Sequence, residues 1–348
     1  MASTRVAACH VAPHFLSARK TANKAISLVH QAARNAANLV VFPESYISAF
    51  PIWSALRPPT ENHDLFSRMV QESLYADGEE VQLLRKAAGE TETVVSVGIS
   101  EKSTASTACL YNSNLIINTK GEVAVHHRKL MPTFFEKLTW SPGDGYGLRV
   151  ADTPYGRIGG LICGENTNPL ARYSLMAQRE QIHISSWPPI WPTRVPTQSA
   201  KALNYDNVLA NRLRAAAHCF EAKCFGVMCS GFLNQSATAS VVSGSSSPEI
   251  VKGAMENSPQ GVSMFLDPTG TPLPSFTVDE DTKVQQPTDF LQHEEGILYG
   301  DMDLQQCIEG KQYHDVVGGY QRFDVFQLQV NRSRKHPVVF TENPSIDD

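Results

Sequence analysis

The chain has 348 residues, of which 42% are hydrophobic and 19% charged, and its formal net charge is -5 at pH 7. This ordinary globular composition excludes extensive disorder, and the acidic balance without long basic runs argues against nucleic acid or anionic lipid as a partner. No apolar stretch reaches the roughly 18 residues of a transmembrane helix, and no secretory leader is recognisable. We therefore expect a cytoplasmic protein with a small-molecule substrate.

Apolar periodicity predicts alternating strands and helices along the whole chain. In chain order, the patterns predict a strand at 5–11, a helix at 17–36, a strand at 38–42, a helix at 79–88, a strand at 93–100, a hairpin at 114–127, two strands within 148–163, a helix at 168–179, a strand at 182–186, a helix from about 200 to 222, and a strand at 224–230. Segments 236–248 and 277–289 are predicted as loops, because Gly, Ser, Thr, Pro and Asp dominate them. This order predicts an α/β fold.

Two chemically versatile side chains stand directly after apolar strands. Glu44 follows Asn38-Leu-Val-Val-Phe-Pro, and Cys163 follows the run that ends in Leu161-Ile162. Ligand clefts form at strand ends in such sheets, so the two residues could meet there. The turn from Cys163 into Gly164 resembles a nucleophile elbow, which presents a side chain on a sharp strand-to-helix turn. Taken singly, however, Cys163 also fits an inert core cysteine, and Glu44 a solvated or helix-capping acid.

The seven cysteines offer no pair at C-x-x-C spacing, so we expect reduced thiols. Cys219, Cys224 and Cys229 lie in an apolar stretch, where free cysteine behaves as a small hydrophobe. We predict no metal site there and no metal or organic cofactor elsewhere.

Three separate blocks together resemble the nitrilase superfamily of carbon-nitrogen hydrolases. They are FPES with Glu44, HRKLMPT with Lys129 and LICGEN with Cys163, in the order that characterises the family. Glu136, in FFEKL, matches the family's second glutamate. The segments TWSPGDG and SSWPP are similar to the versions in true nitrilases. The resemblance extends from Arg5 to about Leu328.

The resemblance implies a four-layer αββα sandwich and a Glu-Lys-Glu-Cys site. Residues 1–275 would form the hydrolase domain, and residues 276–348 would continue it and end in an oligomerisation tail. In the implied mechanism, Glu44 takes the thiol proton, Cys163 attacks the nitrile carbon, and Lys129 stabilises the developing charge. Glu136 would hold the Lys129 ammonium. A thioimidate and then a thioester would form on Cys163 before release of ammonia and the acid.

Further residues are candidates for binding the substrate. Tyr46, Trp53 and Trp187 could wall an apolar pocket, although aromatic side chains of this kind are more often core. Gly164 would give a substrate access to its backbone N–H, and Glu165 resembles the second acid of the family's CxE pattern. Glu165 equally fits an acid beside a helix start.

The sequence departs from the family pattern at two positions, and family roles at these positions are therefore not transferred to this chain. Gly164 stands where many nitrilases have Trp, and Gly319 replaces the usual His in DVVGGYQRFD. Family members pair into dimers that often extend into spirals, so we expect a homo-oligomer. An amidase or carbamoylase would use the same four residues, a cyanide hydratase is a neighbouring alternative, and a non-enzymatic scaffold would keep only the fold.

Overall fold

The computed structural model describes residues 3–194, 204–336, 338 and 341, and within them the strands form two sheets. The larger sheet has the order β12-β11-β13-β1-β2-β3-β4-β5, and the smaller has the order β10-β9-β8-β7-β6. The larger sheet contains β1 Thr4–His10, β2 Leu39–Val41, β3 Val94–Lys102, β4 Leu110–Ile117, β5 Val123–Arg128, β11 Ser275–Val278, β12 Gln285–Pro287 and β13 Gly296–Met302. The smaller contains β6 Ala151–Thr153, β7 Gly156–Ile162, β8 Ile182–Trp187, β9 Phe225–Ser230 and β10 Met264–Leu266.

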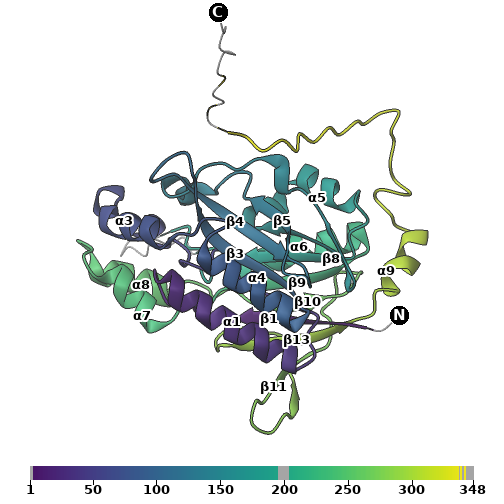
Figure 1. Ribbon diagram of the computed structural model, residues 1–348, viewed down its shortest axis with the longest axis horizontal. Coiled ribbons are helices and arrows are strands. Elements are labelled where there is room, and N and C mark those ends of the chain that lie inside the picture. Colours follow the sequence, from purple (N-terminus) through teal and green to yellow (C-terminus); the bar gives the residue numbers. More distant parts are fainter. Residues whose placement is uncertain (1–2, 195–203, 337, 339–340, 342–348) are drawn as a thin grey trace, which may run out of the picture.

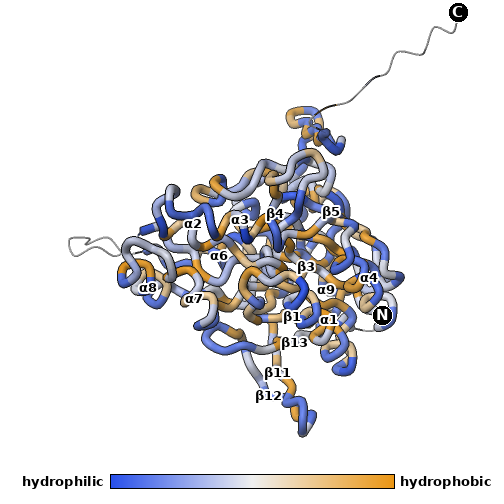
Figure 2. Tube along the Cα trace, turned by 60° about the vertical axis from the view of Figure 1, so that its left-hand side comes forward, coloured by the Kyte–Doolittle hydropathy of each residue, from blue (hydrophilic) through white to orange (hydrophobic). Residues whose placement is uncertain are grey.

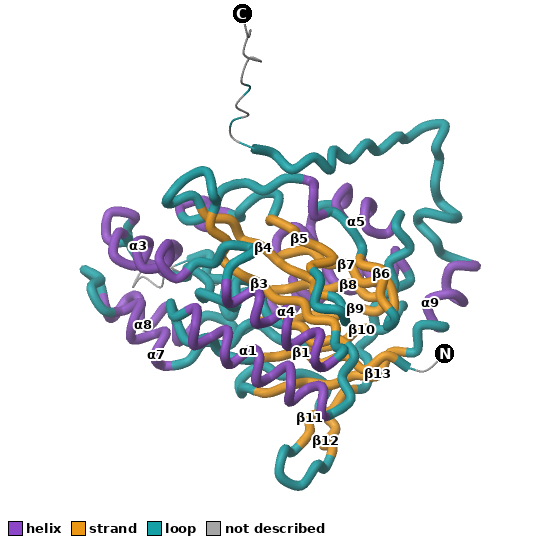
Figure 3. The backbone as a smooth tube through the Cα atoms, in the orientation of Figure 1, coloured by secondary structure: helices purple, strands orange, loops and turns teal. Residues whose placement is uncertain are grey.

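Helices cover the outer face of each sheet, and the two sheets pack against each other (Figure 1). Helices α1 and α4 lie on the larger sheet (Figure 3), and α5 and α6, both labelled in Figure 1, lie on the smaller. The helices are α1 Ala18–Arg34, α2 Trp53–Leu56, α3 His63–Glu72, α4 Glu79–Thr91, α5 Pro169–Met176, α6 Asn207–Ala222, α7 Gln235–Val242, α8 Pro248–Asn257 and α9 Gln306–Glu309. The predicted four-layer αββα sandwich is confirmed.

The alternation of side chains along β1 shows why these layers form. Ala7 and Cys9 pack into the cluster shared with α1 and α4, whereas Val6 and Ala8 pack into the cluster between the sheets. Successive side chains of a strand point to opposite faces, so a strand buried on both faces reads as one apolar run. The same physics explains the continuous run that forms β2.

Strand direction brings separate segments to one edge of the sandwich. Strands β2 and β3 are parallel, and β3, β4 and β5 alternate in direction. Strands β2 and β5 therefore run the same way, and the residues that follow them, Glu44 and Lys129, leave the sheet at the same edge. Strand β7 of the smaller sheet ends at Ile162, immediately before Cys163.

The structure corrects two predicted loops. Residues 235–242 form α7, because Asn234 caps the helix by accepting from the Ala237 N–H, and Ala237 and Val241 are buried. Residues 275–287 form the β11–β12 hairpin, which projects from the body with a hydrophilic tip (Figure 2). In both segments, tertiary packing and capping override a polar composition.

Two other predictions concern the start of α6 and the segment that follows residue 275. Helix α6 begins at Asn207, and residues 200–203 of the predicted helix lie outside the described residues. Strand β13 pairs with β1, so residues beyond 275 contribute to the larger sheet. No helix within the described ranges is long and apolar enough to cross a membrane.

Candidate active site

Glu44 is held on a tightly turned loop after β2. Ser45 has φ 47°, in the left-handed region, and the Ile47 N–H donates to the Gly98 carbonyl on β3. A Cβ at position 98 would collide with the backbone of Pro43, Glu44 and Ser45, so only glycine lets this loop cross β3 so closely. Gly98 thus allows the backbone at Glu44 to lie directly against β3, and this contact sets the position of the Glu44 side chain.

Cys163 occupies the sharp turn that the sequence predicts. Its φ is 51°, and a short 3₁₀ helix, Cys163–Thr167, follows β7 directly. Glu165 stabilises the turn because its carboxylate accepts from the Ile162 and Leu130 N–H groups. The Asn166 amide donates to the Cys163 carbonyl. A strained backbone that is braced on both sides is typical of functional positions.

Lys129 and Glu136 come from the segment that follows β5. Glu136 lies in the short 3₁₀ helix Phe134–Leu138, and its Oε2 accepts from the Thr133 N–H at 3.0 Å. The Lys129 Nζ donates to Glu136 Oε1 and Oε2 at 2.8 and 2.7 Å, and to Glu44 Oε1 at 2.8 Å. All three of these charged side chains are fully buried.

The structure brings all four predicted catalytic residues together. The Cys163 Sγ and one carboxylate oxygen from each of Glu44 and Glu136 lie within 4.8 Å of one another. Glu44 Oε1 accepts from Lys129 and from the Asn112 amide at 2.7 Å, whereas Glu44 Oε2 has no partner among the described residues. Glu44 therefore keeps an oxygen with free acceptor capacity.

Burial and charge set the ionisation of the site. Burial raises the pKa of Glu44 to about 7, against the lowering effect of Lys129, and Glu136 raises it further. Burial also raises the pKa of the Cys163 thiol, and the Glu44 carboxylate adds to this effect. Burial alone would lower the pKa of Lys129, but the negative charges of Cys163, Glu136 and Glu44 raise it well above its usual value. The site thus combines a thiol whose pKa burial raises with a base that titrates near neutrality and a buried cation that the surrounding negative charges stabilise.

A cavity that is partly open to solvent leads to the thiol. Cys163 is only 6% exposed, and the predicted residues Gly164 and Trp187 line the same cavity. The other lining residues are Thr133, Pro188, Trp191, Tyr205, Asn207, Asn211 and Arg214. This arrangement can present a nucleophile, a base and a cation to one small electrophile.

Comparison with known proteins gives the family. Residues 5–312 match the model of the carbon-nitrogen hydrolase family. The chain belongs to this family. The hydrolase is 33% identical to a nitrilase from Penicillium rubens, over 98% of this chain and 97% of that protein. It is 31% identical to an arylacetonitrilase from Hypocrea virens, over 99% of this chain and 96% of that protein. A carbon-nitrogen hydrolase from Helicobacter pylori G27 has a similar fold, with TM-score 0.66 at 17% identity, over 92% of this chain and 96% of that one.

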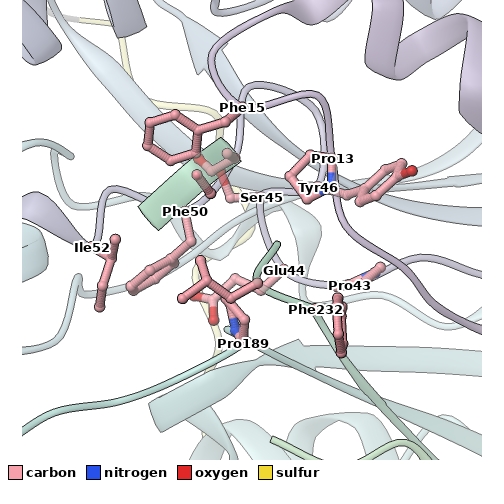
Figure 4. Close-up of a pocket in the computed structure, with 14 residues that line it drawn as sticks. Pro13, Phe15, Pro43, Glu44, Ser45, Tyr46, Phe50, Ile52, Pro189 and Phe232 are labelled. Carbon is pink, nitrogen blue, oxygen red and sulfur yellow. The ribbon is translucent and has the colours of Figure 1, made fainter. Parts of the chain in front are cut away.

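The other candidate residues of the hydrolase occupy different places. Tyr46 lines an apolar cavity beside Glu44, but its ring stacks on Phe42 and points away from that carboxylate (Figure 4). Trp53 is buried in a separate apolar cluster and does not line the Cys163 cavity. Glu165 does not line it either, because both its oxygens bond to His127 and to backbone N–H groups. The structure therefore places Glu165 as a brace of the cysteine turn.

Several residues of the hydrolase site carried no recognisable signal in the sequence. Asn112 is one inward-facing residue of β4, and Thr133 is the last residue of HRKLMPT, where its residue type alone does not single it out. The polar residues Asn207, Asn211 and Arg214, however, have i, i+4, i+7 spacing on α6. That spacing marks one helix face and could have revealed them together.

Glu180, His183 and His218 form a second buried cluster with metal-ligand chemistry. Glu180 Oε1 lies 2.8 Å from His183 Nδ1, and Oε2 lies 2.7 Å from His218 Nε2. His183 Nε2 also lies 2.9 Å from the side-chain Oδ1 of Asn166, so the cluster reaches the cysteine turn through hydrogen bonds. Cys219, Cys224 and Cys229 pack into three different apolar clusters and share no site.

Proposed function

We propose that this carbon-nitrogen hydrolase is a nitrilase, which converts an organic nitrile and two waters into a carboxylic acid and ammonia. The observation that carries the proposal is the Lys129 ammonium, held between Glu44 and Glu136 beside the Cys163 sulfur at the end of a cavity. The relatives named nitrilase and arylacetonitrilase support the nitrile as the substrate class.

In the proposed reaction, Glu44 removes the thiol proton as Cys163 attacks the nitrile carbon. The C–S bond forms, one C–N π bond breaks, and the nitrogen receives a proton to give a thioimidate. Water adds to this carbon as the second C–N π bond breaks, and both protons of the water pass to the nitrogen. The C–N σ bond then breaks and ammonia leaves, which produces a thioester. A second water cleaves the C–S bond, releasing the acid and restoring the thiol. Lys129 stabilises the negative charge that develops on nitrogen and then on oxygen.

The test compares phenylacetonitrile and butanenitrile with the corresponding amides, with ammonia, acid and amide all quantified. We expect acid and ammonia in equal amounts from at least one nitrile. Ammonia from the amides alone would replace the nitrilase assignment with an amidase of the same family. Formation of amide as the sole product from a nitrile would indicate a hydratase.

The proposed base predicts a pH profile. Because the pKa of Glu44 is raised to about 7 and the ionised carboxylate is the active form, kcat/KM should rise with pH up to about 7 and then level off. The Asn112 amide stabilises the carboxylate through its hydrogen bond. Asn112→Ala should therefore move the acid limb to higher pH, measured by kcat/KM from pH 5 to 9. An acid limb that stays in place in this variant would contradict the role of Glu44.

We also infer that the chain forms a homo-oligomer through the outer face of α5 and α6. Leu209, Leu213 and Phe220 lie on one side of α6 and are 54%, 62% and 42% exposed, and Leu170 of α5 is 61% exposed. A row of exposed large apolar side chains is typical of a protein interface. Light scattering should give a mass of two or more chains, and Leu213→Asp should reduce it. A monomeric wild type would contradict the inference.

The seven free thiols support a cytoplasmic location, where cysteines stay reduced. Measured localisation of the full-length protein tests this inference.

A further inference from the structure

One wall of the Cys163 cavity is made by a polar face of α6. Asn207, Asn211 and Arg214 line the cavity, and the two asparagines are buried. The Arg214 guanidinium lies over the Trp187 ring, 4.8 Å from its centroid, and its Nη2 donates to Asn211 Oδ1 at 2.6 Å. These contacts fix the cation in place on the wall that faces the nucleophile.

This wall offers hydrogen-bond donors that lack acceptors. The Asn207 Nδ2 and the Trp187 Nε1 are buried without a partner among the described residues. Arg214 donates to Ala210 O, Thr167 Oγ1 and Asn211 Oδ1, which occupy three of its five N–H groups. Both residues line the cavity, and buried donors without partners are costly, so a ligand that supplies acceptors there would relieve that cost.

The wall also lacks a counter-charge for Arg214. None of the described residues that line this cavity is Asp or Glu. Asp206 is the acidic residue next to the wall, but it is exposed and accepts from the Leu209 N–H as the cap of α6. Residues 195–203, which precede this wall in the chain, contain no acidic residue in their sequence. The cation is therefore available to a ligand.

A second cavity, beside Glu44, has no Arg, Lys, Asn or Gln side chain among the described residues that line it. Phe15, Phe50 and Ile52 line it together with Pro189 and Phe232 (Figure 4). Of these two cavities, Cys163 and Gly164 line only the one that runs along α6. A substrate that reaches the sulfur through this cavity passes the α6 wall.

We propose that the substrate is a small nitrile carrying a carboxylate, and that this carboxylate pairs with Arg214 while the nitrile carbon lies at Cys163. This inference rests on the proposed nitrilase function and names its substrate class. A guanidinium binds a carboxylate through two parallel N–H donors, and the Asn207 and Trp187 donors can complete its shell.

The test uses two nitriles of nearly equal shape, 4-cyanobutanoate and the neutral methyl ketone 5-oxohexanenitrile. In the wild type we expect kcat/KM for the anion to exceed that for the ketone at least tenfold, mainly through a lower KM, and the ratio to fall with added salt. Arg214→Gln should reduce this ratio at least tenfold, and Arg214→Lys should restore part of it. Because the ketone is an internal reference for each enzyme, general damage to the fold lowers both rates and leaves the ratio unchanged.

Arg212 provides a matched control, because it is an exposed arginine on the same helix and does not line the cavity. Arg212→Gln should keep the wild-type ratio. Equal or better turnover of the ketone by the wild type, or a preference for the anion that survives Arg214→Gln, would overturn the inference and leave the nitrilase function standing. If the folded protein hydrolyses neither of the two probes and neither phenylacetonitrile nor butanenitrile, the nitrilase function itself is overturned, and the inference fails with it.

Discussion

Cys163→Ala should lower the turnover of every nitrile substrate by about 10⁴-fold or more, because no other group in the cavity can form the covalent intermediate. The side chain that is removed is small, and the backbone keeps the same strained turn, which Glu165 and Asn166 continue to brace. Stability should therefore change little. The measurements are steady-state rates, thermal unfolding, and the intact mass of enzyme quenched during turnover. The wild type should carry the mass of an acyl adduct that the variant lacks.

Cys109 supplies the control for this experiment. It is more exposed than Cys163 and lies beside Ser141, so its thiol is available to reagents without lining the cavity. Cys109→Ala should keep most of the wild-type activity and still form the adduct. Retention of a tenth or more of wild-type activity in Cys163→Ala would refute the nucleophile assignment.

Lys129→Arg should reduce kcat/KM by about 10³-fold although it preserves the charge. The ammonium has three carboxylate oxygens at 2.7–2.8 Å and is fully buried, so a planar and larger guanidinium cannot take the same position. Lys129→Met should be worse, because it leaves two buried carboxylates without their cation. Losing one partner of a buried ion pair costs about 3–5 kcal/mol, which thermal or denaturant unfolding would detect.

Lys102→Arg is the matched control, since the Lys102 Nζ donates to the Gln71 carbonyl near the surface. It should change unfolding by less than about 0.5 kcal/mol and leave kcat/KM unchanged. If Lys129→Arg retained a tenth of the wild-type activity, the ammonium would not be the stabilising cation of the reaction.

Much of the fold follows from the sequence, because buried strands and amphipathic helices leave strong periodic patterns. β2 and β7 were predictable for this reason, and so was the emergence of Glu44 and Cys163 at their ends. The pattern fails where stability comes from distant partners. The α7 segment looks like a loop until Ala237 and Val241 are packed against the rest of the molecule, and the β11–β12 hairpin depends on pairing with β13.

The sequence predicts the charged residues and the cysteine of the candidate site, but it does not predict most of the residues that line the cavity. Glu44, Lys129, Glu136 and Cys163 occur within recognisable motifs, and the structure brings them together. Side-chain direction is harder to infer from residue type alone. Trp53 was an equally plausible pocket residue, yet its ring packs edge-on against Phe15 and does not line the Cys163 cavity.

The pairing of β1 with β13 has a consequence for synthesis of the chain. Thr4 is opposite Met302, so one edge of β1 stays open until β13 has been synthesised. Such late closure makes the nascent chain prone to misassembly, and a truncation before Gly296 would expose that edge permanently. Because β2, which leads into Glu44, is the other neighbour of β1, the nascent protein should acquire its chemistry only after β13 has been made.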